Sequence, residues 1–167
     1  MSKLIFMDVD GVLNDHERVP FSEMPANYTS ITQRCVANFN RIILACEAVV
    51  VLSSSWRYLI LNEHMSIHGF QTLLTSHGVR GHLISHTRAD AKLDNDDYEP
   101  RWMQIRDWLK EPLNHKGQKV SIDRYCIIDD DPDAFGGRPG VQTNGAVGLT
   151  EKDADEAIAI LNRKDVQ

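Results

Sequence analysis

Residues 4–13 read Leu-Ile-Phe-Met-Asp-Val-Asp-Gly-Val-Leu, an apolar run that ends in two carboxylates and a glycine. The run suits a buried strand, and side chains two positions apart on a strand point to the same side. Asp8 and Asp10 are therefore expected to face the same way if the extended geometry continues past Met7. Neighbouring carboxylates raise each other's pKa unless a cation neutralises them, so the pattern favours a divalent-metal site over a plain solvated turn.

A second apolar run further along the chain ends in the same way. Residues 125–128 (Tyr-Cys-Ile-Ile) lead into the acidic stretch Asp129-Asp130-Asp131-Pro132-Asp133. A third apolar run, residues 48–52, is followed by the hydroxyl series Ser53-Ser54-Ser55 and then by Arg57. Strands of a parallel sheet end at a common edge, so these three runs would deliver their polar side chains to one place.

Length and composition indicate a single globular domain over residues 1–167, with 42% hydrophobic and 25% charged residues. No apolar stretch approaches the roughly 20 residues that cross a membrane, and the first residues lack a signal-peptide pattern, so we expect a cytoplasmic protein without membrane contact. The formal net charge of −6 argues against a stand-alone nucleic-acid binder, although it leaves room for one local basic pocket. Composition identifies no stable protein partner.

Apolar periodicity and turn residues divide the chain into alternating strands and helices. The expected strands end at Met7, Leu52 and Ile128, with further short strands at 83–85 and 141–143. The expected helices are one that starts at an N-cap on Thr29 or Ser30, helices at 57–66, 69–77 and 101–110, and one that follows a capping box at Thr150. This alternation predicts an α/β fold with a doubly wound, Rossmann-like parallel sheet.

Two polar segments interrupt the pattern. Residues 14–28 contain two prolines, and residues 88–100 are acidic and about a dozen long, which is too short for a separate domain. Both are predicted to be mobile loops near the carboxyl edge of the sheet.

Three motifs resemble those of the haloacid dehalogenase (HAD) superfamily, in order and spacing as well as composition. Asp8-Val9-Asp10-Gly11-Val12 is similar to its first motif, Val51-Leu52-Ser53-Ser54 to its second and Ile127-Ile128-Asp129-Asp130 to its fourth. Three further features resemble the small phosphatase-like domains of RNA-repair (polynucleotide 3′-phosphatase-like) proteins. These are the Ser-Ser-Trp-Arg sequence, Arg101 at the start of a helix, and the closing Val-Gln-Thr followed by a helix after Thr150.

The resemblance implies a magnesium-dependent phosphatase that works through an aspartyl-phosphate. Asp8 would be the nucleophile, and Asp10 the general acid that protonates the leaving oxygen and then activates water. Mg²⁺ would be held by Asp8, by the backbone carbonyl of Asp10, and by Asp129 or Asp130. Asp133 would either support the metal or only stabilise the turn at Pro132.

The resemblance leaves alternatives open for the residues that would contact the phosphate. Ser54, with Ser53 as the alternative, would donate to a phosphate oxygen, and the backbone around Ser55 at the following helix start would assist. The lysine of the third motif is missing. Arg101 matches its position and a guanidinium binds phosphate well, while Arg57, Lys92 and Arg106 are rivals.

The substrate is left open between a phosphorylated small molecule, such as a nucleotide, and a phosphorylated nucleic-acid end. The segments between the motifs are only about forty residues each, so the resemblance implies no full cap domain and an open site. A catalytically silent metal- or phosphate-binding module of the same fold is the alternative function, and the missing lysine is its best support. A signalling receiver domain is disfavoured, because its acidic pair precedes its phosphoacceptor and here the order is reversed.

Overall fold

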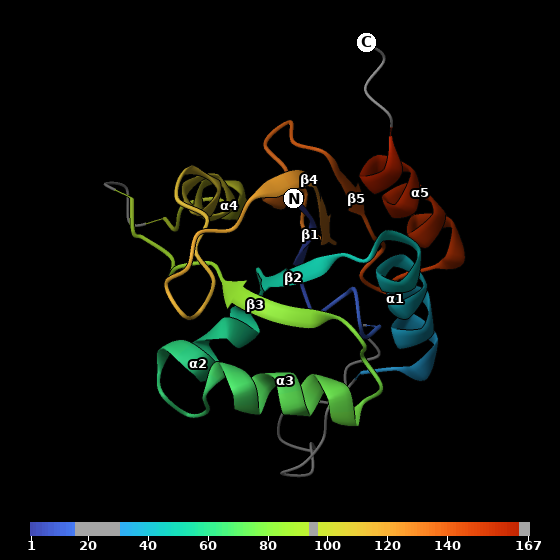
Figure 1. The fold of residues 1–167 in the computed structure, drawn as a ribbon, viewed down its shortest axis with the longest axis horizontal. Coiled ribbons are helices and arrows are strands. Elements are labelled where there is room, and N and C mark those ends of the chain that lie inside the picture. Colours follow the sequence, from blue (N-terminus) through green and yellow to red (C-terminus); the bar gives the residue numbers. More distant parts are fainter. Residues whose placement is uncertain (16–30, 94–96, 164–167) are drawn as a thin grey trace.

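The computed structural model describes residues 1–15, 31–93 and 97–163, and these form one five-stranded parallel sheet with helices on both faces (Figure 1). The strand order is β3-β2-β1-β4-β5. The strands are β1 (Ser2–Met7), β2 (Val49–Leu52), β3 (His82–His86), β4 (Ile122–Asp129) and β5 (Gly140–Gln142). The order reverses at β1, which is where ligands bind in doubly wound sheets. The predicted fold class is thus confirmed.

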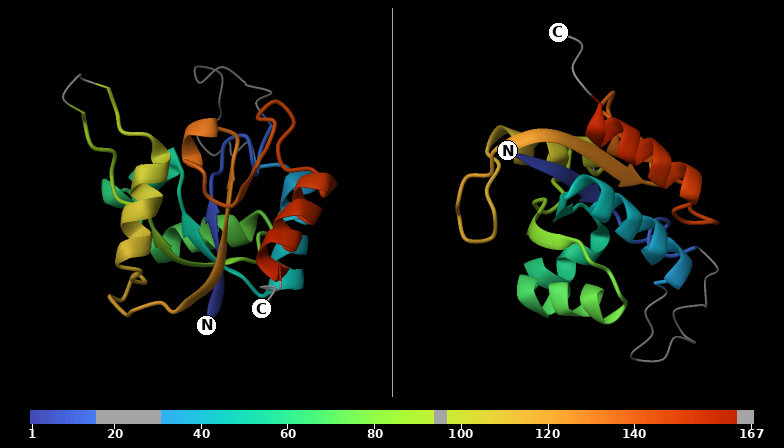
Figure 2. Two further views of the ribbon diagram at one scale, coloured as in Figure 1. Left: turned by 90° about the horizontal axis from the view of Figure 1, so that it is seen from above. Right: turned by 45° about the vertical axis from the view of Figure 1, so that its right-hand side comes forward.

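The helices are α1 (Gln33–Cys46), α2 (Tyr58–Leu61), α3 (Ile67–Ser76), α4 (Arg101–Lys110) and α5 (Glu151–Asn162), with two short 3₁₀ turns, η2 (Ser55–Arg57) and η3 (Pro132–Ala134). Alternate side chains of β1 point to opposite faces of the sheet and belong to two different apolar cores. Ile5 and Met7 pack with residues of α1, α3 and α5, whereas Leu4 and Phe6 pack with α4. Figure 2 shows α4 on one side of the sheet and α1 with α5 on the other.

Capping residues explain the helix limits. The predicted capping box at Thr150 is present: Thr150 Oγ1 accepts from the Asp153 N–H at 3.2 Å, and Asp153 Oδ2 accepts from the Thr150 N–H at 2.9 Å. The first helix begins later than predicted, because Thr32 is its N-cap and accepts from the Cys35 N–H. Residues 29 and 30 lie outside the described part of the chain. Gly78 follows α3 with φ 87°, a left-handed conformation that is common for a glycine after a helix.

Of the two helices predicted after the second strand, the first is shorter than expected, whereas the second, predicted over 69–77, is present as α3. The first, predicted over 57–66, is replaced by η2 and the four residues of α2, after which Glu63 adopts a left-handed φ of 58°. Of the two predicted loops, residues 16–28 lie outside the described residues. The second predicted loop, residues 88–100, contains two contacts in its described part. One is an antiparallel bridge between Lys92 and Tyr98, and the other is an ion pair between Arg88 and Glu99. In the parts of the chain that are described, no helix is both long and apolar enough to span a bilayer.

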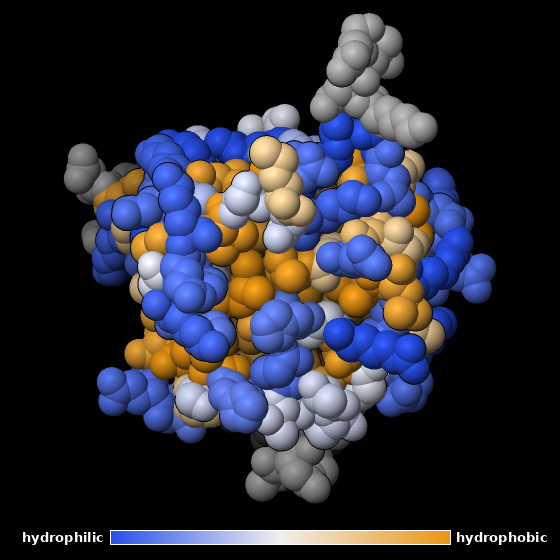
Figure 3. Space-filling view, in the orientation of Figure 1, coloured by the Kyte–Doolittle hydropathy of each residue, from blue (hydrophilic) through white to orange (hydrophobic). Residues whose placement is uncertain are grey.

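The face seen in Figure 3 carries the amino end of the chain. Apolar side chains gather in its middle and polar ones form its rim. A shallow hollow of about 260 Å³ lies there, bordered by Met1, Val49 and Ile84. The strands begin at this face, so the candidate site lies at the opposite edge of the sheet.

Candidate active site

The carboxyl ends of β1 and β4 bring the predicted acidic residues together. Met7 pairs with Ile128 in the parallel ladder, and the Asp8 N–H continues it by donating to the Ile128 carbonyl at 3.0 Å. Asp8 is 5% exposed and Asp129 is fully buried. One carboxylate oxygen each of Asp8, Asp129 and Asp130 lies within 4.8 Å of the others, an arrangement that could hold a metal ion. Residues 8 and 129, far apart in sequence, are thus neighbours.

Arg101 lies between the two buried carboxylates. It is the first residue of α4, and its Nη1 donates to Asp8 Oδ2 and to Asp129 Oδ2, both at 2.7 Å. Its side chain is 20% exposed, so part of the arginine reaches the surface. Of the cations considered for the missing lysine, Arg101 is the one that reaches Asp8. Arg106, on the same helix, pairs with Asp107 and lies over the Trp102 ring instead.

The charges of this cluster are not balanced by Arg101 alone. Burial raises the pKa of the Asp8 carboxyl, although Arg101 and a hydrogen bond from the Ser54 hydroxyl oppose the rise. Burial and then the neighbouring charge of Asp8 raise the pKa of Asp129 to about 8. Burial lowers the pKa of Arg101, but the two carboxylates outweigh this effect and raise it above its usual value. One guanidinium faces two carboxylates, and an additional cation would therefore be stabilised here.

Asp10 does not share the position of Asp8, contrary to the expectation from strand geometry. The strand ends at Met7, and the chain then turns through Gly11, whose φ is +72°. The Asp10 carboxylate instead accepts from Trp56 Nε1 at 2.9 Å and from Asn14 Nδ2 at 2.8 Å. Its side chain is not part of the metal-compatible cluster in the described residues.

Two further contacts hold the turn after β1. The Thr143 hydroxyl donates to the Gly11 carbonyl at 2.7 Å, and Asn14 Oδ1 accepts from the Gly11 N–H at 2.7 Å. A Cβ atom at Gly11 would lie 2.5 Å from Cγ of Asp130, so only glycine fits beside that carboxylate. Sequence reasoning identified the glycine but missed Asn14 and Thr143. The four-residue spacing from Asp10 to Asn14 is a signal that could have suggested the contact made by Asn14.

The serines after β2 take three different positions. Ser54 is buried, hydrogen-bonds Asp8 through its hydroxyl, and accepts from the Trp56 N–H at 3.3 Å. Ser53 is also buried, and its hydroxyl has no hydrogen-bond partner among the described residues. Ser55 is exposed at the start of η2. Ser54 is therefore the serine seen to contact the predicted nucleophile, and the hydroxyl of the adjacent Ser53 is unpaired within the described residues.

Arg57 is one of the candidate phosphate contacts, but its side chain is enclosed by other protein groups. Its side chain is 2% exposed, and all three of its nitrogens are hydrogen-bonded, to the carbonyls of Arg88 and Ser54 and to the side chains of Asp90 and Gln104. A guanidinium enclosed in this way has no donor facing solvent. Arg57 joins the turn after β2 to the segment after β3 and to α4, and so supports the walls of the site rather than lining it.

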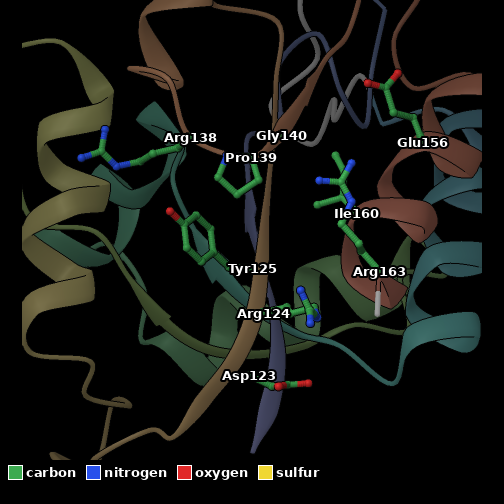
Figure 4. A pocket seen from close by; sticks show the side chains of 9 residues that line it. All are labelled: Asp123, Arg124, Tyr125, Arg138, Pro139, Gly140, Glu156, Ile160 and Arg163. Atoms are coloured by element: carbon green, nitrogen blue, oxygen red, sulfur yellow. The ribbon is translucent and has the colours of Figure 1, made fainter. Parts of the chain in front are cut away.

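A separate pocket of about 610 Å³ lies at the other end of β4 (Figure 4). It follows the first half of the strand, where β5 is too short to pair, since β5 pairs only with residues 127–129. Arg124, Arg138 and Arg163 border it together with Asp123 and Glu156. Figure 4 shows Arg138 pointing toward α4 while Arg124 lies on the α5 side of the strand. No predicted site residue lines this pocket.

The fold and the carboxyl-edge cluster define the class of protein: an α/β domain with the first and fourth acidic motifs of the HAD superfamily at adjacent strand ends. More specifically, the chain belongs to the family described as the HAD domain in Swiss Army Knife RNA repair proteins, whose model matches residues 4–154. The predicted superfamily and its RNA-repair-like subgroup are thereby confirmed. A comparison with curated proteins finds no match.

Proposed function

We propose that the protein is a magnesium-dependent phosphomonoesterase that forms an aspartyl-phosphate on Asp8. The observation that carries the proposal is the contact of Arg101 with Asp8 and Asp129 at 2.7 Å each, at the edge of the sheet where β1 and β4 end. A carboxylate beside the guanidinium of a partly exposed arginine is suited to attack a phosphate ester, because the guanidinium can hold the phosphate oxygens. Membership of a HAD family supports the same chemistry.

The acidic cluster fits a magnesium ion. Asp8, Asp129 and Asp130 offer three oxygens close together, which is the donor type that Mg²⁺ prefers. Burial and then the neighbouring charge of Asp8 raise the pKa of Asp129, and a divalent cation beside these carboxylates would favour their charged forms. Asp8, Asp129 and Asp130 would hold the metal, with the Asp10 carbonyl as a further ligand, and the metal would neutralise charge on the phosphate.

The reaction is divided between two carboxylates. An oxygen of Asp8 bonds to phosphorus while the bond from phosphorus to the leaving oxygen breaks, and Asp10 gives that oxygen a proton. Asp10 then takes a proton from water, whose oxygen attacks phosphorus and releases Asp8 and inorganic phosphate. Ser54 and Arg101 bind the phosphate oxygens throughout, with the backbone near Ser55.

The proposed substrate is a nucleotide or a phosphorylated nucleic-acid end. The family description favours this class, and the predicted lack of a cap domain leaves room for a large molecule. A screen would compare phosphate release from oligonucleotides with a 3′ or a 5′ phosphate and from phosphorylated metabolites. Release from the oligonucleotides at least tenfold faster than from the metabolites supports this class, and the reverse order contradicts it.

The direct test of the reaction uses an aryl phosphate with and without Mg²⁺. Asp8→Asn should abolish hydrolysis, whereas Asp123→Asn should leave it unchanged, because Asp123 is exposed at the other end of β4. Loss of activity on chelation and its return with Mg²⁺ are also expected. A wild-type protein that binds phosphate but hydrolyses none of these esters would instead be a silent binding module.

A further inference from the structure

Trp56 joins the turn after β2 to the turn after β1. Its indole Nε1 donates to Asp10 Oδ2 at 2.9 Å, a contact between residues forty-six positions apart. The ring packs against the larger apolar core and meets the buried ring of Phe70 edge to face, with centroids 6.4 Å apart. The indole is thus anchored on α3 at one side and directed at the Asp10 carboxylate on the other.

Both oxygens of Asp10 are held by donors from different segments. Asn14 Nδ2 donates to Oδ1 at 2.8 Å, and the Asn14 amide is itself fixed because its Oδ1 accepts from the Gly11 N–H. The Asn14 contact is local, within the turn that also contains Asp10. The Trp56 contact comes from another strand end and therefore fixes Asp10 relative to Ser54, which precedes Trp56 by two residues and hydrogen-bonds Asp8.

Packing alone does not require a tryptophan at this position. A Leu or Phe could fill an apolar core position, whereas tryptophan adds one N–H that can only donate. Here that N–H meets a carboxylate rather than a backbone carbonyl or solvent. The general acid must lie within hydrogen-bond reach of the leaving oxygen, and a displacement of about 1 Å can cost roughly a hundredfold in rate.

We propose that Trp56 is a positioning residue that holds the Asp10 carboxylate in line with the leaving oxygen of the ester. The inference rests on the proposed function, in which Asp10 is the general acid. It adds a role for the tryptophan of the Ser-Ser-Trp-Arg sequence. Trp56 touches neither the phosphate nor the reacting atoms and acts through Asp10.

The contact itself is tested by NMR on the whole chain, without any substrate. The chain has three tryptophans, so the ¹H–¹⁵N spectrum should contain three indole signals, and Trp56→Phe identifies the signal of Trp56 by its loss. In Asp10→Ala that signal should shift and exchange faster with solvent. The signal of Trp108, which donates to Ser85 Oγ at 3.1 Å, should stay in place. An unchanged Trp56 signal would overturn the proposal.

The kinetic test compares Trp56→Phe with Trp108→Phe on aryl phosphates of graded leaving-group acidity. Both variants lose one indole N–H that donates to a side-chain oxygen, and both rings pack edge to face on a phenylalanine, yet only Trp56 contacts Asp10. A displaced general acid matters most for poorly acidic leaving groups. We expect Trp56→Phe to lose about ten- to hundredfold in kcat/KM, which reports the step that expels the leaving group, on these esters and little on the most acidic ones.

The outcomes separate the inference from the proposed function. Trp108→Phe should change all esters by the same factor or not at all. An equal loss of kcat/KM on every ester in Trp56→Phe, or wild-type kcat/KM throughout, would overturn the positioning role. A wild type that hydrolyses none of the esters would overturn the proposed function, and the indole signal in Asp10→Ala would still decide whether Trp56 holds Asp10.

Discussion

Replacing Arg101 by Gln should expose the charge imbalance at the candidate site. Arg101 is the guanidinium between Asp8 and Asp129, which are 5% and 0% exposed, so the variant leaves two buried carboxylates facing each other. Breaking a buried ion pair by removing one partner costs about 3–5 kcal/mol. Asp129, with a pKa of about 8, already holds a proton near pH 7 and so limits the repulsion, and we therefore expect the lower end, about 3 kcal/mol, at pH 7 in the absence of metal.

Thermal unfolding in a chelator measures this loss. At roughly 2–4 °C per kcal/mol for a domain of this size, the melting temperature should fall by about 6–12 °C. The loss should grow with pH, because the carboxylates then cannot remain protonated. Mg²⁺ should restore much of the stability, since a ligand at a hundred times its Kd adds about 2.7 kcal/mol.

Arg106→Gln is the matched control for this prediction. Arg106 lies on the same helix but pairs with Asp107 at the surface, with 34% of its side chain exposed, so it should cost about 1 kcal/mol or less and show no added response to Mg²⁺. A loss below about 1 kcal/mol in Arg101→Gln would show that Arg101 does not neutralise this site, because a buried carboxylate that loses its counter-charge is destabilised by more than that.

Two further predictions concern the same cluster. Asp129 has a pKa of about 8 in the folded chain against 3.8 for the ordinary carboxyl, so the folded state binds the extra proton and wild-type stability should fall as pH rises from about 4 to 8. Asp129→Asn removes this titration. Urea unfolding without metal should give the variant a larger free energy of unfolding than wild type at pH 8 but not at pH 4. An equal difference between the two proteins at both pH values would contradict this expectation. Gly11→Ala should cost about 1–2 kcal/mol for its left-handed φ and should also weaken Mg²⁺ binding in calorimetry, because its Cβ would displace Asp130. Gly117→Ala, with φ +73° and open space around it, should cost the same strain without changing the metal affinity, and equal Mg²⁺ affinities in the two variants would count against the role of Asp130.

Much of the fold could be predicted because its signals are local. The apolar runs before Asp8, Ser53 and Asp129 gave the three central strands, and Arg101 to Lys110 was predicted as a helix with the bounds it has. The start of α1 was placed too early, since Thr29, Ser30 and Thr32 are all good N-caps and only the tertiary structure selects one. The second helix was predicted too long because apolar periodicity does not show where the chain turns at Glu63.

The site could be predicted where its residues stand at strand ends and not where they depend on tertiary contacts. Asp8, Asp129 and Arg101 meet as the motif order indicated. Arg57 stands in the same strand-end sequence, but its burial depends on Asp90 and Gln104, which no local pattern links to it. The contact of Trp56 with Asp10 was missed for the same reason. It joins two turns whose relative position is set only when β1 and β2 pair.

The proposed reaction requires that Asp8 attack phosphorus beside a magnesium ion held by Asp8, Asp129 and Asp130. The most direct measurement is a crystal structure of the protein with Mg²⁺ and beryllium fluoride, which mimics a phosphoryl group on a carboxylate. We expect a beryllium–oxygen bond to Asp8, with the metal against the three carboxylates and Arg101 turned toward a fluorine. Beryllium fluoride bound away from Asp8, or a metal bound without contact to Asp129 and Asp130, would contradict this expectation.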